Sequence, residues 1–385
     1  MNAELKKDYL WIILFLIVFL NGFEAGGYQA SLWSVGKDFD LSVTKMGLYA
    51  SMELFATMLA PILLGKWADA VRKDRSISVL LALQLIASTA ILITASNLFF
   101  LVSIFFLGIT TSALQFISIA ALADAYPLSR EKKIAYMTSM YAVGALISPL
   151  AVDFYLRNNL SWRTLFGVLA AGSLISLTGI IRNGCAPREE KPGKSEHHTA
   201  GTFVLSAILL LSVIMCIYVG FENGFTFFVD TLFTDVFAVS TGKFALSLFW
   251  AVMIPSRILV GRYSRYSGRI LIASILLIPA SMLVLYNVSN PDLVLLLCIP
   301  LGFASGAIYP CVLTLALPYT GTKTATATGI ITAATGIGGV VFTALTGFMA
   351  DRFGLPNAML ILVSFFLISF AAAIAVVRKE PPADL

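Results

Sequence analysis

The chain has 385 residues, of which 58% are hydrophobic and 12% are charged, whereas a soluble domain has roughly 45–50% apolar and about 25% charged residues. This composition favours a protein whose main solvent is the lipid bilayer. The net charge of +5 comes from basic residues spread over many loops, so it does not indicate a nucleic-acid-binding surface. The four cysteines show no paired spacing, which predicts neither a disulfide framework nor a metal site.

Apolar segments of about 20 residues, long enough to span a bilayer, recur along the whole chain. We predict twelve transmembrane helices with approximate centres at Asn21, Phe55, Ala87, Ser112, Ala145, Gly172, Cys216, Ala251, Leu277, Ser305, Gly336 and Ile368. The first segment runs well past the apolar core of a secretory signal and contains Glu24, so we expect it to be retained as a helix. The predicted fold class is an all-α membrane protein.

One longer connection separates the sixth and seventh segments. Residues 183–202 are polar and contain Pro and Gly, which is typical of a flexible linker. We therefore predict an N-terminal six-helix bundle at residues 1–182 and a C-terminal one at residues 203–385. Most Lys and Arg residues fall on the side of the membrane that holds the N-terminus, which predicts that both termini are cytoplasmic. We expect a monomer in a bacterial inner membrane.

The first and seventh segments share a short pattern that brings a carboxylate into the membrane. Residues 21–27 read Asn-Gly-Phe-Glu-Ala-Gly-Gly, and residues 220–224 read Gly-Phe-Glu-Asn-Gly. A charge at that depth costs about 3 kcal/mol or more, and such residues usually face a water-filled cavity and mark an ion or substrate pathway. We predict Glu24 and Glu222 as proton-coupling residues. The alternative for each is a carboxyl group permanently hydrogen-bonded between helices.

Further charges lie at or near membrane depth, namely Glu53, Asp124, Asp153, Asp230 and Arg257. For Glu53, an outer gate and a solvated rim are equal alternatives. We expect Asp230 to be solvated near the outer surface and Arg257 to extend toward the inner surface. The third, sixth, ninth and twelfth segments carry no such charge, which predicts that every third helix faces lipid while the others line a cavity.

Polar and aromatic side chains at helical spacing around the two glutamates predict the solute site. Asn21, Glu24 and Tyr28 share one face of the first helix. Aromatic rings can stack on the apolar face of a sugar. The predicted substrate-binding set is Asn21, Tyr28, Gln115, Tyr218, Asn223, Thr226, Trp250 and Tyr309. The alternative for the hydroxyl and amide groups is hydrogen bonding between helices, and the alternative for the rings is core packing.

Several short motifs resemble the major facilitator superfamily over essentially the whole chain. The loop after the second helix, residues 65–75, resembles the loop motif of that family, with Ala70 and Arg72 departing from the usual residues. The loop after the eighth helix, residues 261–269, resembles the same motif but has Arg265 in place of the aspartate. Residues 123–132, 161–163 and 347–354 resemble further marks of the family. The resemblance implies two pseudo-symmetric six-helix halves.

The resemblance also implies a secondary transporter that works by alternating access, with its solute bound near the bilayer midplane between the halves. Residues 218–222 and 302–310 resemble the fucose permease and glucose/galactose permease branch, which implies proton-coupled transport of a sugar-like solute. Ile104 stands where the family often has an arginine that partners the proton carboxylate. A proton-driven exporter of drugs or metabolites is the alternative, because a carboxylate beside aromatic rings also suits a cationic solute. A non-transporting receptor or lipid scramblase is a third possibility.

The loop after the second helix is predicted to act as a gate. The predicted gating residues are Gly65, Asp69, Arg72, Asp124 and Arg130. We expect Gly65 to let backbones approach, and Asp69 to face the positive N-terminal end of the eleventh helix near Thr324. The alternative is a basic loop that only sets the topology. The sequence has no phosphate loop or nucleophile triad, so we expect no enzyme and no cofactor; the expected partners are a small solute, protons and lipid.

Overall fold

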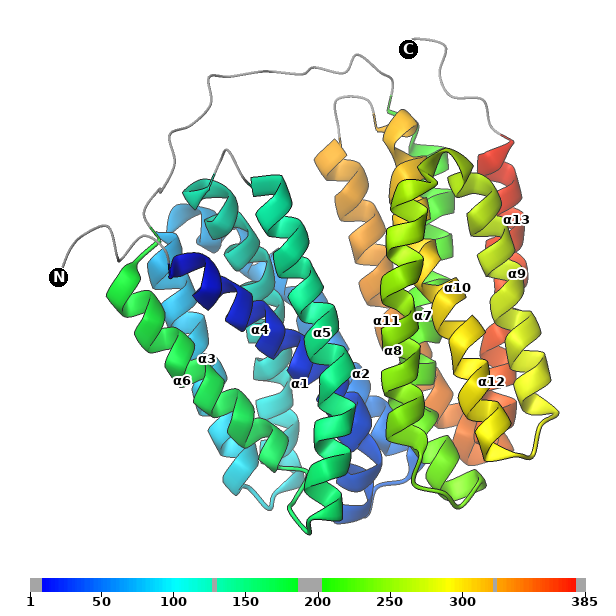
Figure 1. Cartoon of the computed structure of the whole chain (residues 1–385), viewed down its shortest axis with the longest axis horizontal. Coiled ribbons are helices and arrows are strands. Elements are labelled where there is room, and N and C mark those ends of the chain that lie inside the picture. Colours follow the sequence, from blue (N-terminus) through cyan, green and yellow to red (C-terminus); the bar gives the residue numbers. More distant parts are fainter. Residues whose placement is uncertain (1–8, 127–129, 186–202, 321–323, 379–385) are drawn as a thin grey trace. The chain divides into compact units, whose positions relative to one another are not determined.

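The computed structural model describes residues 9–126, 130–185, 203–320 and 324–378. These residues form helices and connecting turns, with no strand among them. Twelve helical spans are long and apolar enough to cross a bilayer, which confirms the predicted fold class (Figure 1). A helix satisfies its own backbone hydrogen bonds within one segment, and this makes it one of the few structures that can cross a medium without water.

Within each half of the chain, the helices follow one another with short connections (Figure 1). The first half of the chain contains α1 (Leu10–Asp38), α2 (Val43–Ala70), α3 (Lys73–Ile93), α4 (Asn97–Ala125), α5 (Arg130–Arg157) and α6 (Thr164–Asn183). The second half contains α7 (Leu205–Thr231), the π-helical turn η1 (Leu232–Val236), α8 (Gly242–Arg262), the 3₁₀ turn η2 (Ser264–Tyr266), α9 (Ser267–Tyr286), α10 (Pro291–Ala316), the 3₁₀ turn η3 (Leu317–Tyr319), α11 (Thr324–Phe353), α12 (Leu355–Ser364) and α13 (Phe366–Val377). The last two helices together make the twelfth span, Leu355–Val377.

Local residue chemistry sets several of these helix ends. The Asn290 side chain accepts a hydrogen bond from the Asp292 backbone N–H at 2.9 Å, and Pro291 occupies the first turn of α10. Such caps satisfy backbone donors that have no partner inside the helix. Gly354 separates α11 from α12 with a φ of +80°, a conformation that glycine adopts without steric cost.

The chain divides into two compact units. Unit 1 holds the described residues up to Ser31 and those from Met52 to the end of α6, whereas unit 2 holds Leu32–Ser51 and everything from α7 onward. The C-terminal end of α1 and the N-terminal end of α2 therefore group with the second half of the chain. Most of the predicted linker, residues 186–202, lies outside the described residues, so the predicted domain boundaries at 182 and 203 stay a prediction.

Glycines in the repeated pattern bring helices close together in the same way in both units. In unit 1, a Cβ on Gly22 or Gly26 would collide with the α5 backbone, at Tyr141 and Ala145 respectively. In unit 2, Gly220 packs against Phe342 and Gly224 packs against Thr346, both on α11. The two copies of the pattern therefore place Glu24 and Glu222 between pairs of glycines that face α5 and α11, the fifth helix of each half.

Candidate functional site

The centre of unit 1 holds a carboxyl group that lies away from water. Glu24 on α1 is 1% exposed, and its Oε1 atom has no hydrogen-bond partner among the described residues. One turn earlier, the Asn21 side-chain amide donates to the Thr111 carbonyl on α4 at 2.9 Å. The Oδ1 atom of Asn21 is also buried without a described partner. A buried acceptor without a hydrogen-bond partner costs free energy. Packing alone therefore does not explain why these two polar side chains lie here.

A second acid lies in the same region. Glu53 on α2 is 6% exposed, so it is not the solvated rim residue that was one of its two sequence-based alternatives. Its backbone carbonyl accepts a hydrogen bond from the Thr57 hydroxyl at 3.0 Å. The same carbonyl packs against Gly108 on α4. The Glu24 and Glu53 side chains interact electrostatically, and neither carboxyl forms an ion pair with a basic side chain in the described part of the chain.

Unit 2 surrounds its equivalent acid differently. Glu222 on α7 is half-buried, and it interacts with the buried hydroxyl of Tyr218 and with the Arg257 guanidinium on α8. Arg257 also interacts with Tyr309 on α10. Arg257 was expected to extend toward the inner surface, but in the structure its positive charge interacts with Glu222. Helical periodicity along α8 could not reveal that this face lies toward α7.

The other predicted solute contacts divide into accessible and packed side chains. Gln115 and Asn223 are half-buried, and Tyr309 is 40% exposed. Thr226 and Tyr28 are fully buried, and Trp250 is nearly so. The Tyr28 ring packs on Phe100 with centroids 6.3 Å apart. Their roles as solute contacts stay predictions, and the accessible three are the stronger candidates.

Two of the polar groups on α7 already bond within their own helix. The Asn223 side-chain amide donates to the Val219 carbonyl at 2.9 Å, and the Thr226 hydroxyl donates to the Asn223 carbonyl at 3.4 Å. These local bonds use donors of both side chains. The Asn223 side-chain oxygen therefore remains its most available group for a solute.

Asp230 overturns an expectation at the far end of α7. It is 1% exposed and pairs with Lys243 at 2.7 Å, so it is not solvated. Gly242 makes room for this pair, because a Cβ there would meet the Asp230 backbone and carboxyl. The π-helical turn η1 begins two residues after Asp230, and such turns often occur at functional sites. The sequence showed both charges but not that they meet.

Only some of the predicted gating residues lie in the described part of the structure. Nothing lies within 4 Å of a Cβ built on Gly65 among the described residues, and the expectation that this glycine lets backbones approach stays a prediction. Asp124 is exposed. The side chains of Asp69, Arg130 and Thr324 lie outside the described residues, and the gating roles of this set stay predictions.

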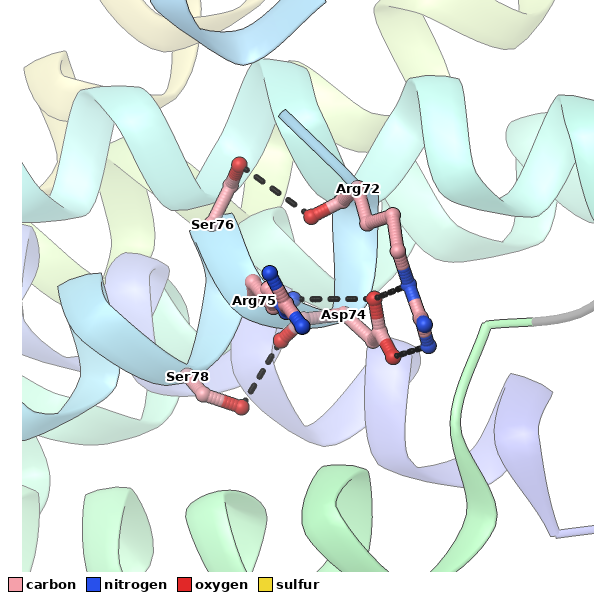
Figure 2. Close-up of polar contacts among 5 residues, drawn as sticks. All are labelled: Arg72, Asp74, Arg75, Ser76 and Ser78. Atoms are coloured by element: carbon pink, nitrogen blue, oxygen red, sulfur yellow. Dashed lines mark hydrogen bonds and ion pairs between the residues drawn. The ribbon is translucent and has the colours of Figure 1, made fainter. Parts of the chain in front are cut away.

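Arg72 is held by its own loop. Its guanidinium contacts the Asp74 carboxylate at 3.1 Å through Nε and at 2.6 Å through Nη2, as Figure 2 shows. This hydrogen bond and the negative charge of Asp74 raise the pKa of Arg72. Arg72 is largely exposed, and exposed ion pairs contribute little to stability. The pair shapes the entry to α3, where Asp74 also accepts from the Arg75 backbone N–H at 3.0 Å.

A carboxylate at a helix N-terminus is present, although with partners that the sequence did not suggest. Asp351, at the end of α11, accepts from the Val43 and Thr44 backbone N–H groups at the start of α2, at 3.1 and 2.9 Å. Nearby, Gly47 and Gly347 pack closely and the Ser51 hydroxyl donates to the Val340 carbonyl at 2.9 Å. These contacts hold the segment Leu32–Ser51 on α11 inside unit 2.

Comparison with known proteins decides the family. The model of the Major Facilitator Superfamily matches residues 14–325 and 270–385. The chain belongs to this superfamily. It is therefore an integral membrane protein that moves small solutes by secondary transport, and it is not an enzyme.

Relatives of known sequence are distant but nearly full-length. The chain is 23% identical over 358 residues to the glucose/mannose transporter GlcP of Bacillus subtilis (strain 168), covering 86% of this chain and 85% of the relative. It is 22% identical over 352 residues to a TsgA homolog of Buchnera aphidicola, covering 88% and 89%. A shorter match, 26% identical over 154 residues, joins it to the multidrug resistance protein MdtM of Salmonella typhimurium and covers 40% of this chain and 37% of MdtM.

Solved structures agree on the fold. A bacterial homolog of the human lysosomal transporter Spinster matches with a TM-score of 0.84 and 17% identity, covering 99% of this chain and 100% of that one. A D-xylose-proton symporter matches with a TM-score of 0.77 and 14% identity, covering 100% of both chains. At these identities the likeness shows the architecture alone.

Proposed function

We propose that the protein is a proton-coupled symporter for a small polar, sugar-like solute. The observation that carries the proposal is Glu24, a buried carboxyl group with an unsatisfied oxygen and no basic partner in the described residues. An isolated buried charge is so unfavourable that the group must exchange a proton or find a counter-ion. Proton exchange at Glu24 would couple the proton gradient to solute movement.

The coupling follows from the charge state of Glu24. With its proton bound, the site is neutral and the protein can change conformation without carrying a bare charge through the membrane. With its proton released, the negative charge favours the conformation that admits water to the carboxyl group. Loading the solute and the proton together from one side, and releasing both on the other, gives symport.

Unit 2 supplies the solute-recognition groups in this proposal. The carboxylate of Glu222 accepts hydrogen bonds and the Arg257 guanidinium donates them, so together they match the hydroxyl groups of a sugar. The exposed ring of Tyr309 offers an apolar surface. Glu222 was also predicted to exchange protons. Its basic neighbour makes Glu24 the better candidate for that role.

Names of the relatives support a polar solute without identifying it. One near-full-length relative is a glucose/mannose transporter, and one structural neighbour is a xylose-proton symporter. The match to a multidrug resistance protein favours the second candidate, proton-driven export of an amphipathic cation. The bias of Lys and Arg toward the loops on one side also supports cytoplasmic termini, and we further propose a bacterial inner membrane and a monomer.

The test is transport by protein reconstituted in vesicles, with a pH-sensitive dye and a panel of neutral monosaccharides. We expect one or more sugars to drive protons in the same direction as the sugar, and Glu24→Gln to exchange sugar across the membrane without moving protons. Asp153→Asn is the matched control, because Asp153 is also a buried carboxylate of unit 1 but is paired with Arg157 at 2.7 Å. Proton movement opposite to an amphipathic cation would establish the exporter instead, and unchanged coupling in Glu24→Gln would contradict the role of Glu24.

A further inference from the structure

We propose that Glu53 on α2 is the working partner of Glu24, and that the two facing carboxyl groups form one proton site that alternates between one and two bound protons. This inference rests on the proposed proton coupling, which by itself assigns no role to Glu53. It adds a second residue to the coupling site and sets the number of protons moved per cycle at one.

Packing against α4 places the two acids at the same level. Asn21 on α1 bonds to the carbonyl of Thr111 on α4. Glu24 lies one turn further along α1, and Gly108 lies one turn back along α4. Successive spans alternate in direction, so α1 and α4 run in opposite directions. Glu24 and Gly108 are therefore displaced from the Asn21–Thr111 bond in the same direction. Gly108 is the residue against which the Glu53 backbone packs, so Glu24 and Glu53 lie at the same level of unit 1, and their side chains interact electrostatically.

Close approach of the α2 and α4 backbones depends on Gly108. A Cβ at this position would collide with the Glu53 carbonyl and would also lie 2.9 Å from the Ala56 side chain. The Thr57 hydroxyl lies 3.4 Å from the Gly108 carbonyl. Gly108 thus sets the position of Glu53 along the axis of α4. The hydrogen bond of the Asn21 amide sets the position of Glu24 along the same axis.

Two buried carboxyl groups that interact electrostatically cannot both carry a charge at reasonable cost. One proton held between them lets a carboxyl O–H donate to the neighbouring carboxylate, and this charge-assisted bond is stronger than a bond between neutral groups. The pair then bears a single negative charge. Uptake of a second proton makes it neutral, and release of that proton restores the first state, so one proton moves in each cycle.

The titratable groups around the pair do not replace this partnership. Tyr28 lies on α1 and packs on Phe100, and Tyr141 lies on α5 against Gly22. Asp153 and Arg157 on α5 neutralise each other in an ion pair of 2.7 Å. Among the described residues of unit 1, no Lys or Arg forms an ion pair with either glutamate, so a proton is the available counter-charge.

The second unit carries the same framework without the second acid. Gly302 on α10 packs against the Phe249 carbonyl on α8, as Gly108 on α4 packs against the Glu53 carbonyl on α2. The position that corresponds to Glu53 is therefore a phenylalanine, and Glu222 has Arg257 as its charged neighbour. The described residues of unit 2 thus have no carboxyl pair at this level.

The experiment is an infrared pH titration of the purified full-length protein, following the C=O band of protonated carboxyl groups. Two coupled acids lose their protons in two separated macroscopic steps that belong to the pair. We expect the part of the band that is lost in the Glu24→Gln/Glu53→Gln double variant to titrate in two steps in the wild type, and in one step in Glu24→Gln and in Glu53→Gln, each of which leaves a single carboxyl at the site. Asp153→Asn should keep both steps. If Glu53→Gln retains the two-step titration, the shared site is wrong.

Two further measurements keep the proposal separate from the function itself. Glu53→Asp retains a carboxyl group and should restore two steps, which shows that any failure of Glu53→Gln is not misfolding; one step in a folded Glu53→Asp variant would contradict the pairing. If the band does not respond to pH but disappears when sodium ions are added, the site binds a metal cation, and the shared proton is overturned. If instead the titration shows two steps but no solute moves protons in vesicles, the carboxyl pair stands and the proposed symport fails.

Discussion

The same short motif has two electrostatic environments in this protein. In unit 1, Glu24 is buried and interacts electrostatically with another buried acid, Glu53. In unit 2, Glu222 is half-buried and faces a phenol and a guanidinium. The glycines around both acids pack on the equivalent helices, so the backbone framework does not cause the difference. Their charged neighbours do, because α2 contributes Glu53 beside Glu24 and α8 contributes Arg257 beside Glu222.

The largest expected effect comes from removing the acid of unit 1. Glu24→Gln keeps the size of the side chain and removes its charge, so the accumulation of solute against a gradient should be lost and solute should only equilibrate, because its flow is no longer tied to that of protons. Exchange of solute between the two sides should continue, because exchange needs no net proton transfer. Uptake and counterflow in the same vesicles measure both quantities. Loss of exchange as well would mean that Glu24 holds the structure and not the proton.

Breaking the buried ion pair between Lys243 and Asp230 in unit 2 should lower the stability of the protein and leave the coupling of solute to protons unchanged. Lys243→Met leaves Asp230 buried without its partner, which costs about 3–5 kcal/mol. Thermal unfolding in detergent should therefore shift clearly downward. The double variant Lys243→Met with Asp230→Leu should recover most of the loss, because no charge remains buried. A double variant as unstable as the single one would show that the pair does more than neutralise itself.

The solute-recognition role of unit 2 is tested by Arg257→Ala. Hydrogen bonds to charged groups contribute about 1.5–3 kcal/mol, so the KM for the solute should rise about 10-fold to 100-fold. The ratio of protons to solute moved should stay unchanged if coupling resides in unit 1. Glu222→Gln should raise the KM in the same way. If either change removes proton movement while binding persists, the division of roles between the two units is wrong.

A smaller effect is expected where Asp351 caps α2. Asp351→Ala removes a carboxylate that accepts two backbone N–H groups, and lost caps cost about 0.5–2 kcal/mol. The segment Leu32–Ser51 should then separate from α11 more often. A cysteine introduced at Ser51, which is buried and bonded to Val340, should react faster with a hydrophilic maleimide than in the parent. Equal labelling rates would show that the other contacts suffice.

Much of the architecture was predictable because the bilayer imposes a simple rule on sequence. A chain crossing hydrocarbon must satisfy its backbone internally over about 20 residues, and the apolar segments centred from Asn21 to Ile368 follow that rule. The repeated Gly-Phe-Glu pattern and the short loop motifs were equally legible, and they pointed to the family that comparison then showed. The carboxylates Glu24 and Glu222 were recognisable as costly and therefore meaningful.

The tertiary structure alone decided what each charged residue meets. Periodicity tells which residues share a face of one helix, but it does not tell which helix lies opposite that face. For this reason Glu53 could be read as a rim residue, Asp230 as solvated and Arg257 as a surface charge, although the fold joins them to Glu24, Lys243 and Glu222. The sequence by itself determined the number of spans and the buried acids, and packing between helices determined their partners and hence their chemistry.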